Sequence, residues 1–545
     1  MQENTFLRGA FILAGAGAIT RMLGIFYLIP LPRIIHDEGM GLLQMVRPIY
    51  YFAFVISVAG LPVAVSKLVA ERAALGDVKG IYRIFRTAVG IMLCLGLSST
   101  LALLAGASWL STHVLKDPGA YYALVAIAPS VIFLALIAAF RGFFHGLQYM
   151  TPSAVSQVGE QLVRVVGTLI LAYYFMPQGV EMGAAGASFG SVIGALVGVV
   201  VFLGYYLAVR RRLLAAPQRK AHPKDSIGSI LRQLFTLAWP VILGAILLPI
   251  MQIIDTAIVP ARLRTAGFTL EEVREWYGYL GMALNMMGIP TVITVALSAS
   301  LVPAIAEGVV LGSRRTVDYR TQEAIRISLL TGLPAAAGMF ILARAISYML
   351  FGYSQVGIPL AILAGGTLAL GLHQTTAGIL QGLGQVALPV RNLLAGACLK
   401  LAVSYLLTAI PGFGIRGAAW GTTLGFALPA LLNLVALRRL LKVELKVMES
   451  FIKPALAAGV MVVVVQGTYN LVYSGAYALG LSLVNGQADF WANAAGTLAA
   501  IFLGVITYCL VLLLNGGIKR RDLELMPRYG PTVARHLERT GLLHR

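Results

Sequence analysis

Cationic side chains inside otherwise apolar segments are the residues of this sequence that could do chemistry. Arg21 lies in the middle of the first long apolar segment and Arg47 near the start of the second, whereas Arg164 lies in the fifth and Lys400 in the eleventh. The planar donor fork of arginine matches the oxygens of a phosphate group. A cavity lined with these cations would therefore attract a phosphate or pyrophosphate head group.

Three of these cations also have a structural interpretation. Glu160 and Arg164 are four residues apart and share a helix face, and we favour an ion pair between them that holds helices together. Arg21 has no acidic residue within a turn or two, which favours a cavity-facing role. Arg47 lies near a predicted interface, where snorkelling to lipid head groups and substrate contact both remain open.

Two Gly-x-Pro segments would break or bend the helices that contain them, because proline removes a backbone hydrogen bond. They are Gly60-Leu61-Pro62 and Gly288-Ile289-Pro290. Their corresponding positions in the two halves of the chain indicate hinges that let each half bend. Passive kinks that improve packing are the alternative.

The other reactive residue types predict neither an active site nor a metal centre. Residues 36–38 (His-Asp-Glu) resemble an outward-facing loop, and the three cysteines lie in apolar runs without the spacing of metal ligands. The sequence shows no nucleophile elbow, no phosphate loop and no paired carboxylates in a water-accessible setting. We therefore expect no catalytic residues, no metal and no cofactor.

The composition requires lipid as the solvent for much of this chain. Of its 545 residues, 58% are hydrophobic and 12% charged, whereas a soluble domain carries about 25% charged residues. The net charge of +20 comes from basic residues gathered in alternate loops. This distribution suits cytoplasmic loops that face an anionic leaflet, not a nucleic-acid partner, and it places both termini in the cytoplasm.

Helices are the structure that such a chain must adopt in lipid, since every backbone hydrogen bond has to be closed. At about 20 apolar residues per crossing, the pattern predicts an all-α integral membrane protein with about fourteen transmembrane helices. The predicted spans are 7–35, 43–68, 83–108, 120–141, 154–176, 183–208, 230–258, 277–303, 322–343, 355–382, 387–410, 416–437, 453–474 and 491–514.

Four short motifs recur in the same order at a nearly constant shift, which indicates an internal duplication. The matches are 60–63 with 288–291, 30 with 260, 145–147 with 381–383, and 183–185 with 417–419. Arg164 and Lys400 then occupy corresponding points. Two parallel six-helix bundles around a central cavity suit alternating access. We predict an N-lobe over 1–212, a cytoplasmic linker over 213–229, a C-lobe over 230–440, two further helices over 441–515 and a cytoplasmic tail over 516–545.

Longer strings resemble the stage V sporulation protein B group over essentially the whole chain. The resemblance places the sequence in the multidrug/oligosaccharidyl-lipid/polysaccharide exporter superfamily, beside the MurJ-type lipid II flippases. The strings are 20–24 (TRMLG), 59–71 (AGLPVAVSKLVAE), 140–152 (FRGFFHGLQYMTP), 157 with 160–164 (EQLVR), 290–298 (PTVITVALS) and 378–384 (GILQGLG).

The resemblance implies a V-shaped pair of bundles that flips an undecaprenyl-pyrophosphate-linked precursor of peptidoglycan. Through its Arg-x-x-Gly motif, Arg21 matches a functionally important arginine of helix 1 in MurJ-type proteins. Two other arginines of that type are replaced here, one by Tyr27 and one by Asn285. We therefore expect Arg47, Arg164 and Lys400 to supply replacement charge, with Asn285 at the same head-group site.

The resemblance also implies an ion site between helices 7, 11 and 12, where some MurJ-type proteins look to bind sodium. Asp255 matches the helix 7 carboxylate, but Lys400 and Ser404 stand where ligands of helix 11 would be. An ammonium group there would repel sodium. We expect an Asp255–Lys400 pair to replace the ion, with Glu160 as a further internal ion-pair residue, and transport driven by membrane potential or protons.

These observations together predict a monomeric flippase of a lipid-linked oligosaccharide in the bacterial plasma membrane, with lipid II as the favoured substrate. Growth and sporulation roles in cell-wall synthesis both fit. Another polyprenyl-linked polysaccharide unit is an alternative. A drug or cation antiporter of this fold should carry acidic cavity residues, and a membrane glycosyltransferase should carry a catalytic carboxylate in a sizeable outer loop. The duplicated prolines count against a structural scaffold.

Overall fold

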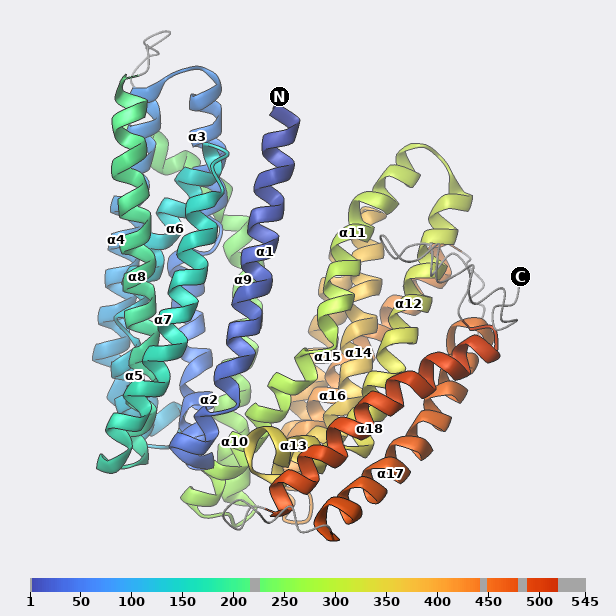
Figure 1. Ribbon diagram of the computed structural model, residues 1–545. Helices are drawn as coiled ribbons and strands as arrows, with labels where there is room; N and C mark the ends of the chain where they lie inside the picture. The colour runs from blue at the N-terminus through green and yellow to red at the C-terminus, as the bar shows by residue number, and fades with distance from the viewer. Residues whose placement is uncertain (1, 216–225, 442–447, 479–487, 518–545) are drawn as a thin grey trace. The chain divides into compact units, whose positions relative to one another are not determined.

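The chain folds into two compact units of helices, residues Met1–Gly278 and Tyr279–Arg545. The computed structural model describes residues 2–215, 226–441, 448–478 and 488–517, and every regular element in these ranges is helical (Figure 1). Most of the predicted linker, 213–229, and of the predicted tail, 516–545, lies outside the described residues.

The first unit holds the helices up to the start of α10, including α9, which packs on α2 and α3. Its helices are α1 (Gln2–Leu28), α2 (Leu31–Val58), α3 (Leu61–Ala74), α4 (Val78–Trp109), α5 (Ala120–Ile127), α6 (Ser130–Gly146), α7 (Thr151–Phe175), α8 (Val180–Ala215), α9 (Ile227–Thr265) and α10 (Leu270–Gly288).

The second unit begins within α10 and contains the remaining helices. They are α11 (Thr291–Val310), α12 (Arg314–Ile341), α13 (Ala343–Phe351), α14 (Gly357–Gly382), α15 (Ala387–Thr408), α16 (Ile415–Leu441), α17 (Lys453–Ala478) and α18 (Ala488–Leu514). α17 and α18 pack against each other, and α17 also packs on α12 (Figure 1).

Twelve helical segments among the described residues are long and apolar enough to cross a membrane. Each overlaps a predicted span, although 277–303 was placed too early, because it covers the second half of α10 and only part of Thr291–Val310. The predicted spans 7–35 and 230–258 fall on α1 and α9, where part of the side chains lies outside the described residues. Large apolar side chains are exposed along these helices, as lipid contact requires. The chain is a multi-pass helical membrane protein.

The first predicted span ends earlier than expected. α1 stops at Leu28 and α2 begins at Leu31, so the helix does not run on to residue 35. Pro30 explains the break, because it lacks an N–H and its ring displaces the preceding turn. The predicted outward loop at 36–38 is instead part of α2, at a kink where His36 has φ 58°.

Both Gly-x-Pro segments interrupt helices. α2 ends at Val58 and α3 begins at Leu61, while α10 ends at Gly288 and α11 begins at Thr291. Gly60 has φ +76°, a conformation that only glycine adopts without strain. The breaks lie where the sequence places them, and their action as hinges stays a prediction.

The two glycines should respond differently to alanine. A Cβ on Gly60 would lie 2.6 Å from the carbonyl oxygen of Ala238, whereas a Cβ on Gly288 would meet nothing within 4 Å. We expect Gly60→Ala to destabilise the purified protein by about 1–3 kcal/mol, and Gly288→Ala to leave its thermal unfolding unchanged. Equal midpoints for the two variants would contradict the strained geometry at Gly60.

The units share a packing arrangement where the sequence repeats. In the first unit, a Cβ on Gly146 of α6 would lie 2.6 Å from Val69 Cβ of α3; in the second, a Cβ on Gly382 of α14 would lie 2.7 Å from Ile305 Cβ of α11. Each glycine thus allows two helix backbones to approach closely. The duplicated motifs therefore produce the same kind of close helix–helix contact in each unit.

Candidate functional site

A polar cluster in the first unit gathers several of the predicted site residues. Arg164 Nη1 of α7 lies 3.7 Å from Glu160 Oε1, and Arg164 also donates a hydrogen bond to Gln161 Oε1. Glu160 is buried, whereas the Arg164 side chain is 37% exposed. The structure thus contains the favoured ion pair, and it leaves part of the guanidinium accessible to a further partner.

Helices α2 and α6 extend this cluster. Tyr50 of α2 hydrogen-bonds Ser130 of α6 and lies within electrostatic range of Arg47, Glu160 and Arg164. Arg141 of α6 also lies within electrostatic range of Glu160. We call Arg47, Tyr50, Arg141, Glu160 and Arg164 the Glu160 cluster. It contains three arginines and one carboxylate, so its net charge is positive.

Arg21 lies on α1, the helix that packs on α7, and its side chain is exposed. Three residues further on, a Cβ on Gly24 would lie 3.4 Å from Gln161 Nε2. The Arg-x-x-Gly motif therefore brings α1 close to α7 beside the Glu160 cluster, less than one helical turn from Arg21.

Lys400 in the second unit repeats one feature of Arg164. A Cβ on Gly194 of α8 would lie 2.7 Å from Arg164 Cβ, and a Cβ on Gly425 of α16 would lie 2.7 Å from Lys400 Cβ. Each cation thus has its stem packed against a glycine of the following helix. Both side chains are half-buried.

Asp255 and Asn285 are half-buried as well. Asp255 lies in α9 within electrostatic range of Tyr277, whose hydroxyl is 2.9 Å from Thr256 Oγ1. Asp255 belongs to the first unit, whereas Asn285 and Lys400 belong to the second. The proposed Asp255–Lys400 pair stays a prediction.

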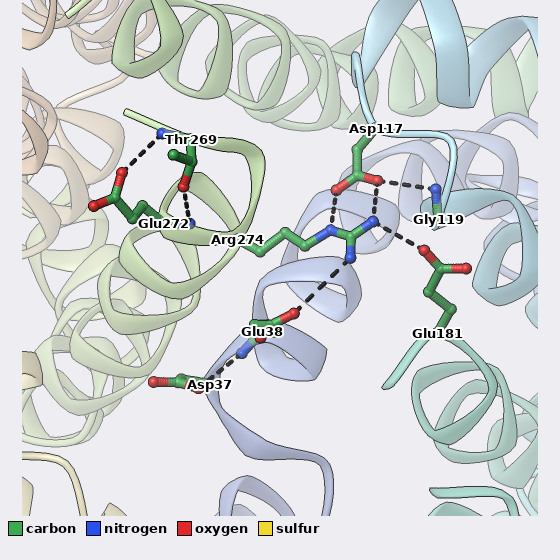
Figure 2. Close-up of polar contacts among 8 residues, drawn as sticks. All are labelled: Asp37, Glu38, Asp117, Gly119, Glu181, Thr269, Glu272 and Arg274. Carbon is green, nitrogen blue, oxygen red and sulfur yellow. Dashed lines mark hydrogen bonds and ion pairs between the residues drawn. The ribbon is translucent and has the colours of Figure 1, made fainter. Parts of the chain in front are cut away.

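A second charged cluster was not predicted from the sequence. Arg274 of α10 forms a two-pronged ion pair with Asp117, with Nε–Oδ2 2.6 Å and Nη2–Oδ1 2.7 Å. Its Nη2 also donates to Glu181 Oε1 at 3.0 Å, and its Nη1 lies 3.9 Å from Glu38 Oε2. Figure 2 shows these three carboxylates around one guanidinium. We call the four residues the Arg274 cluster.

Local structure places these groups precisely enough for two-pronged pairing. Thr269 and Glu272 form a reciprocal capping box that starts α10, with Thr269 N to Glu272 Oε2 at 2.8 Å and Glu272 N to Thr269 Oγ1 at 3.2 Å. Asp117 Oδ1 also accepts from Gly119 N at 2.9 Å (Figure 2). A Cβ on Gly119 would meet Glu181 Oε1 and Arg274 Nη2, so alanine there would displace the ends of these two side chains.

Close backbone packing of α10 on α2 completes the cluster. A Cβ on Gly41 would lie 2.0 Å from the carbonyl oxygen of Arg274, and one on Gly278 would lie 2.5 Å from that of Asp37. Asp117 is 1% exposed and Arg274 8% exposed. The hydrogen bonds to Asp117 raise the pKa of Arg274 although burial opposes this. The cluster lies at the helix ends that the charge asymmetry predicts to face outside.

The carboxylates next to this cluster predict a pH dependence of stability. Burial, followed by Asp37 and Glu38, raises the pKa of Glu275. A raised carboxyl pKa means that the native state binds the proton more tightly than the unfolded state, so stability falls as pH rises from about 4.5 through the native pKa. Glu275→Gln should therefore raise the melting temperature by about 1–2 °C at pH 7 but not at pH 4.5. An equal gain at both pH values would contradict this origin.

The membrane-spanning helices, together with the relatives that share this sequence and fold, define the class of protein: a multi-pass membrane transporter. The family model described as "Polysaccharide biosynthesis protein" matches residues 6–309. Stage V sporulation protein B of Bacillus subtilis (strain 168) is 31% identical over 98% of this chain and 100% of its own length. The chain belongs to the polysaccharide biosynthesis protein family, within the multidrug/oligosaccharidyl-lipid/polysaccharide exporter superfamily.

Two comparisons with MurJ proteins agree with this assignment. Lipid II flippase MurJ of Bacillus subtilis (strain 168) is 26% identical over 80% of this chain and 83% of its own. A solved lipid II flippase MurJ in an inward closed conformation superposes with a TM-score of 0.67 at 14% identity, covering 94% of this chain and 100% of that one. The latter likeness shows a shared fold.

Proposed function

We propose that this protein flips a lipid-linked oligosaccharide across the plasma membrane, with lipid II as its substrate and alternating access as its mechanism. The observation that carries the proposal is the positive Glu160 cluster inside the first unit, with the Arg21 helix packed beside it. A pyrophosphate loses hydration on leaving water, and arginine donors replace that hydration. The proposal includes the topology: fourteen spans, arranged as two six-helix bundles plus two further helices, with both termini in the cytoplasm.

The composition of the charged clusters favours this substrate over the alternatives. A transporter of organic cations needs uncompensated acidic groups, whereas the Glu160 cluster has a surplus of arginine. A glycosyltransferase needs an available catalytic carboxylate on the outside, and four of the outer carboxylates are engaged: Asp117 and Glu181 bond Arg274, Glu272 caps α10 and Asp489 accepts from Tyr473 at 2.5 Å. Other polyprenyl-linked glycans share the pyrophosphate, so the experiment must compare lipid II with at least one of them.

The test is leaflet accessibility of fluorescent lipids in vesicles that contain the purified protein. We expect lipid II to move between leaflets faster than in protein-free vesicles, and faster than a polyprenyl-linked glycan of another structure. Movement of the other glycan but not of lipid II would show that the other glycan, and not lipid II, is the substrate. Movement of an organic cation but of neither lipid would overturn the flippase.

A further inference from the structure

Four consecutive polar residues interrupt the apolar helix α14 of the second unit: His373, Gln374, Thr375 and Thr376. The segment Ser354–Gly382 is long and apolar enough to span a membrane, and His373 lies well inside it. Ionisable residues within a span are costly to bury and mark functional sites by default. The sequence carries this signal, yet the transport site proposed above makes no use of it.

The hydrogen bonds around His373 assign its proton. Thr376 Oγ1 donates to the Leu372 carbonyl at 2.7 Å, so it can only accept from Asn433 Nδ2, which lies at 3.2 Å. Asn433 Nδ2 also faces His373 Nδ1 at 3.3 Å, and Asn433 Oδ1 accepts from Asn392 Nδ2 at 2.8 Å. His373 Nδ1 is thus an acceptor, and the neutral ring carries its proton on Nε2.

The surroundings of His373 are neutral. The helices packed on α14 carry Glu307 on α11, the charged residues within 314–326 on α12, Arg344 on α13, Arg391 and Lys400 on α15, and Arg416, Arg438 and Arg439 on α16. Among the described residues, no charged or titratable group on these helices has a resolved electrostatic effect at His373. The amide and hydroxyl groups that hydrogen-bond the ring therefore determine whether a positive charge on it is stabilised.

We propose that His373 Nδ1 is a proton-binding site of the second unit. A proton on Nδ1 would oppose the Asn433 Nδ2 donor, and the long 3.3 Å bond is the weakest in the network. Rotation of the Asn433 amide presents Oδ1 to the new N–H, and rotation of Asn392 then presents its own Oδ1 to Asn433 Nδ2. The two amides exchange donor and acceptor roles, and the three side chains keep their hydrogen bonds to one another. Thr376 Oγ1, which accepts from Asn433 Nδ2 before the rotation, must then turn its proton from the Leu372 carbonyl to Asn433 Oδ1.

The burial pattern suits such a switch. Asn433 and Thr376 are 0% exposed, so water does not compete for their hydrogen bonds, whereas His373 is 9% exposed and Asn392 is half-buried. The centre of the network is thus sealed, and its two outer members, His373 and Asn392, retain room to accept a proton or to turn. A proton bound there in one step of the cycle would serve as the coupling ion. This coupling role rests on the proposed flippase function; the protonation does not.

Selective ¹⁵N-histidine labelling of the full-length protein in lipid nanodiscs tests the protonation directly. The chain has seven histidines, and the signal absent from His373→Gln identifies the residue. At pH 8 this signal should show the Nε2–H tautomer, and it should convert to imidazolium between pH 8 and pH 5. A His373 that stays neutral down to pH 5, or that is the Nδ1–H tautomer at pH 8, would overturn the proposal. The signal of His113, which is exposed, serves as the control for complete labelling.

Vesicles with an imposed pH gradient test the coupling. One pH unit is a tenfold ratio of proton concentrations, so flipping by the wild type should accelerate by up to about tenfold. His113→Gln should keep this response and His373→Gln should lose it. Wild-type flipping that ignores the gradient overturns the coupling but leaves the flippase intact. An absence of any flipping overturns the flippase, and the histidine titration still decides the proton site.

Discussion

Arg274→Ala should destabilise the protein by about 3–5 kcal/mol, because removing one partner of a buried ion pair leaves the other charge unpaired. Asp117, at 1% exposure, would keep only its hydrogen bond from Gly119 N and lose both short contacts to the guanidinium. Heating the protein in detergent and measuring the fraction that remains folded by size-exclusion chromatography gives the loss of stability. Arg274→Lys should fall between the wild type and Arg274→Ala, since an ammonium cannot span both carboxylate oxygens.

Matched substitutions separate this pair from a general effect of lost charge. Arg264→Ala removes an exposed arginine from the end of α9 and should be neutral. Glu181→Gln should cost little, because Glu181 is 39% exposed on its side chain. In a double-mutant cycle, Asp117→Ala combined with Arg274→Ala should destabilise less than the sum of the single changes. Additive effects would show that the two-pronged pair is not the source of stability.

Arg164→Ala should slow lipid II flipping by about 10–100-fold, which corresponds to the loss of a charge-assisted hydrogen bond to the pyrophosphate. Arg164→Lys should retain an intermediate rate, because the charge remains while the donor fork is lost. Glu160→Gln removes the carboxylate that competes with the substrate for Arg164, at 3.7 Å, and should not slow flipping. The vesicle assay with fluorescent lipid II measures all three variants.

The opposite pattern would identify Arg164 as a structural residue. If it only pairs with Glu160, then Arg164→Ala and Glu160→Gln should lower thermal stability alike and affect flipping alike. Arg21→Ala extends the test, because the side chain is exposed and its loss should slow flipping without lowering the melting temperature. Arg315→Ala, which removes an exposed arginine of α12, is the control and should leave both quantities unchanged.

Interactions between near neighbours could be predicted from the sequence. The Glu160–Arg164 pair follows from their i,i+4 spacing, and the breaks at Gly60 and Gly288 follow from the prolines beside them. The Arg274 cluster could not be predicted in this way, because its partners are 157 and 93 residues away. The capping box that starts α10 fixes the beginning of the Arg274 helix but does not reveal which carboxylates Arg274 contacts.

The same division holds in the second unit. The polar run in α14 stands out against its apolar neighbours, but Asn433 lies 60 residues from His373 and 41 from Asn392. An amide is compatible with many helix faces, so its type alone does not reveal which histidine it contacts. Glycines also let α7 approach α8 and α15 approach α16. The sequence shows these glycines but does not show which pairs of helices they bring close together.

By itself, the sequence determined a helical membrane protein with duplicated motifs, helix breaks at two Gly-x-Pro segments and few ionisable residues within its spans. Hydrophobicity and backbone hydrogen bonding act over one or two helical turns, so their effects can be predicted from the order of the residues. The tertiary structure decided which of those ionisable residues meet. Buried charges and amides are held by partners that chain folding brings together, and their pairing energy depends on distances between helices.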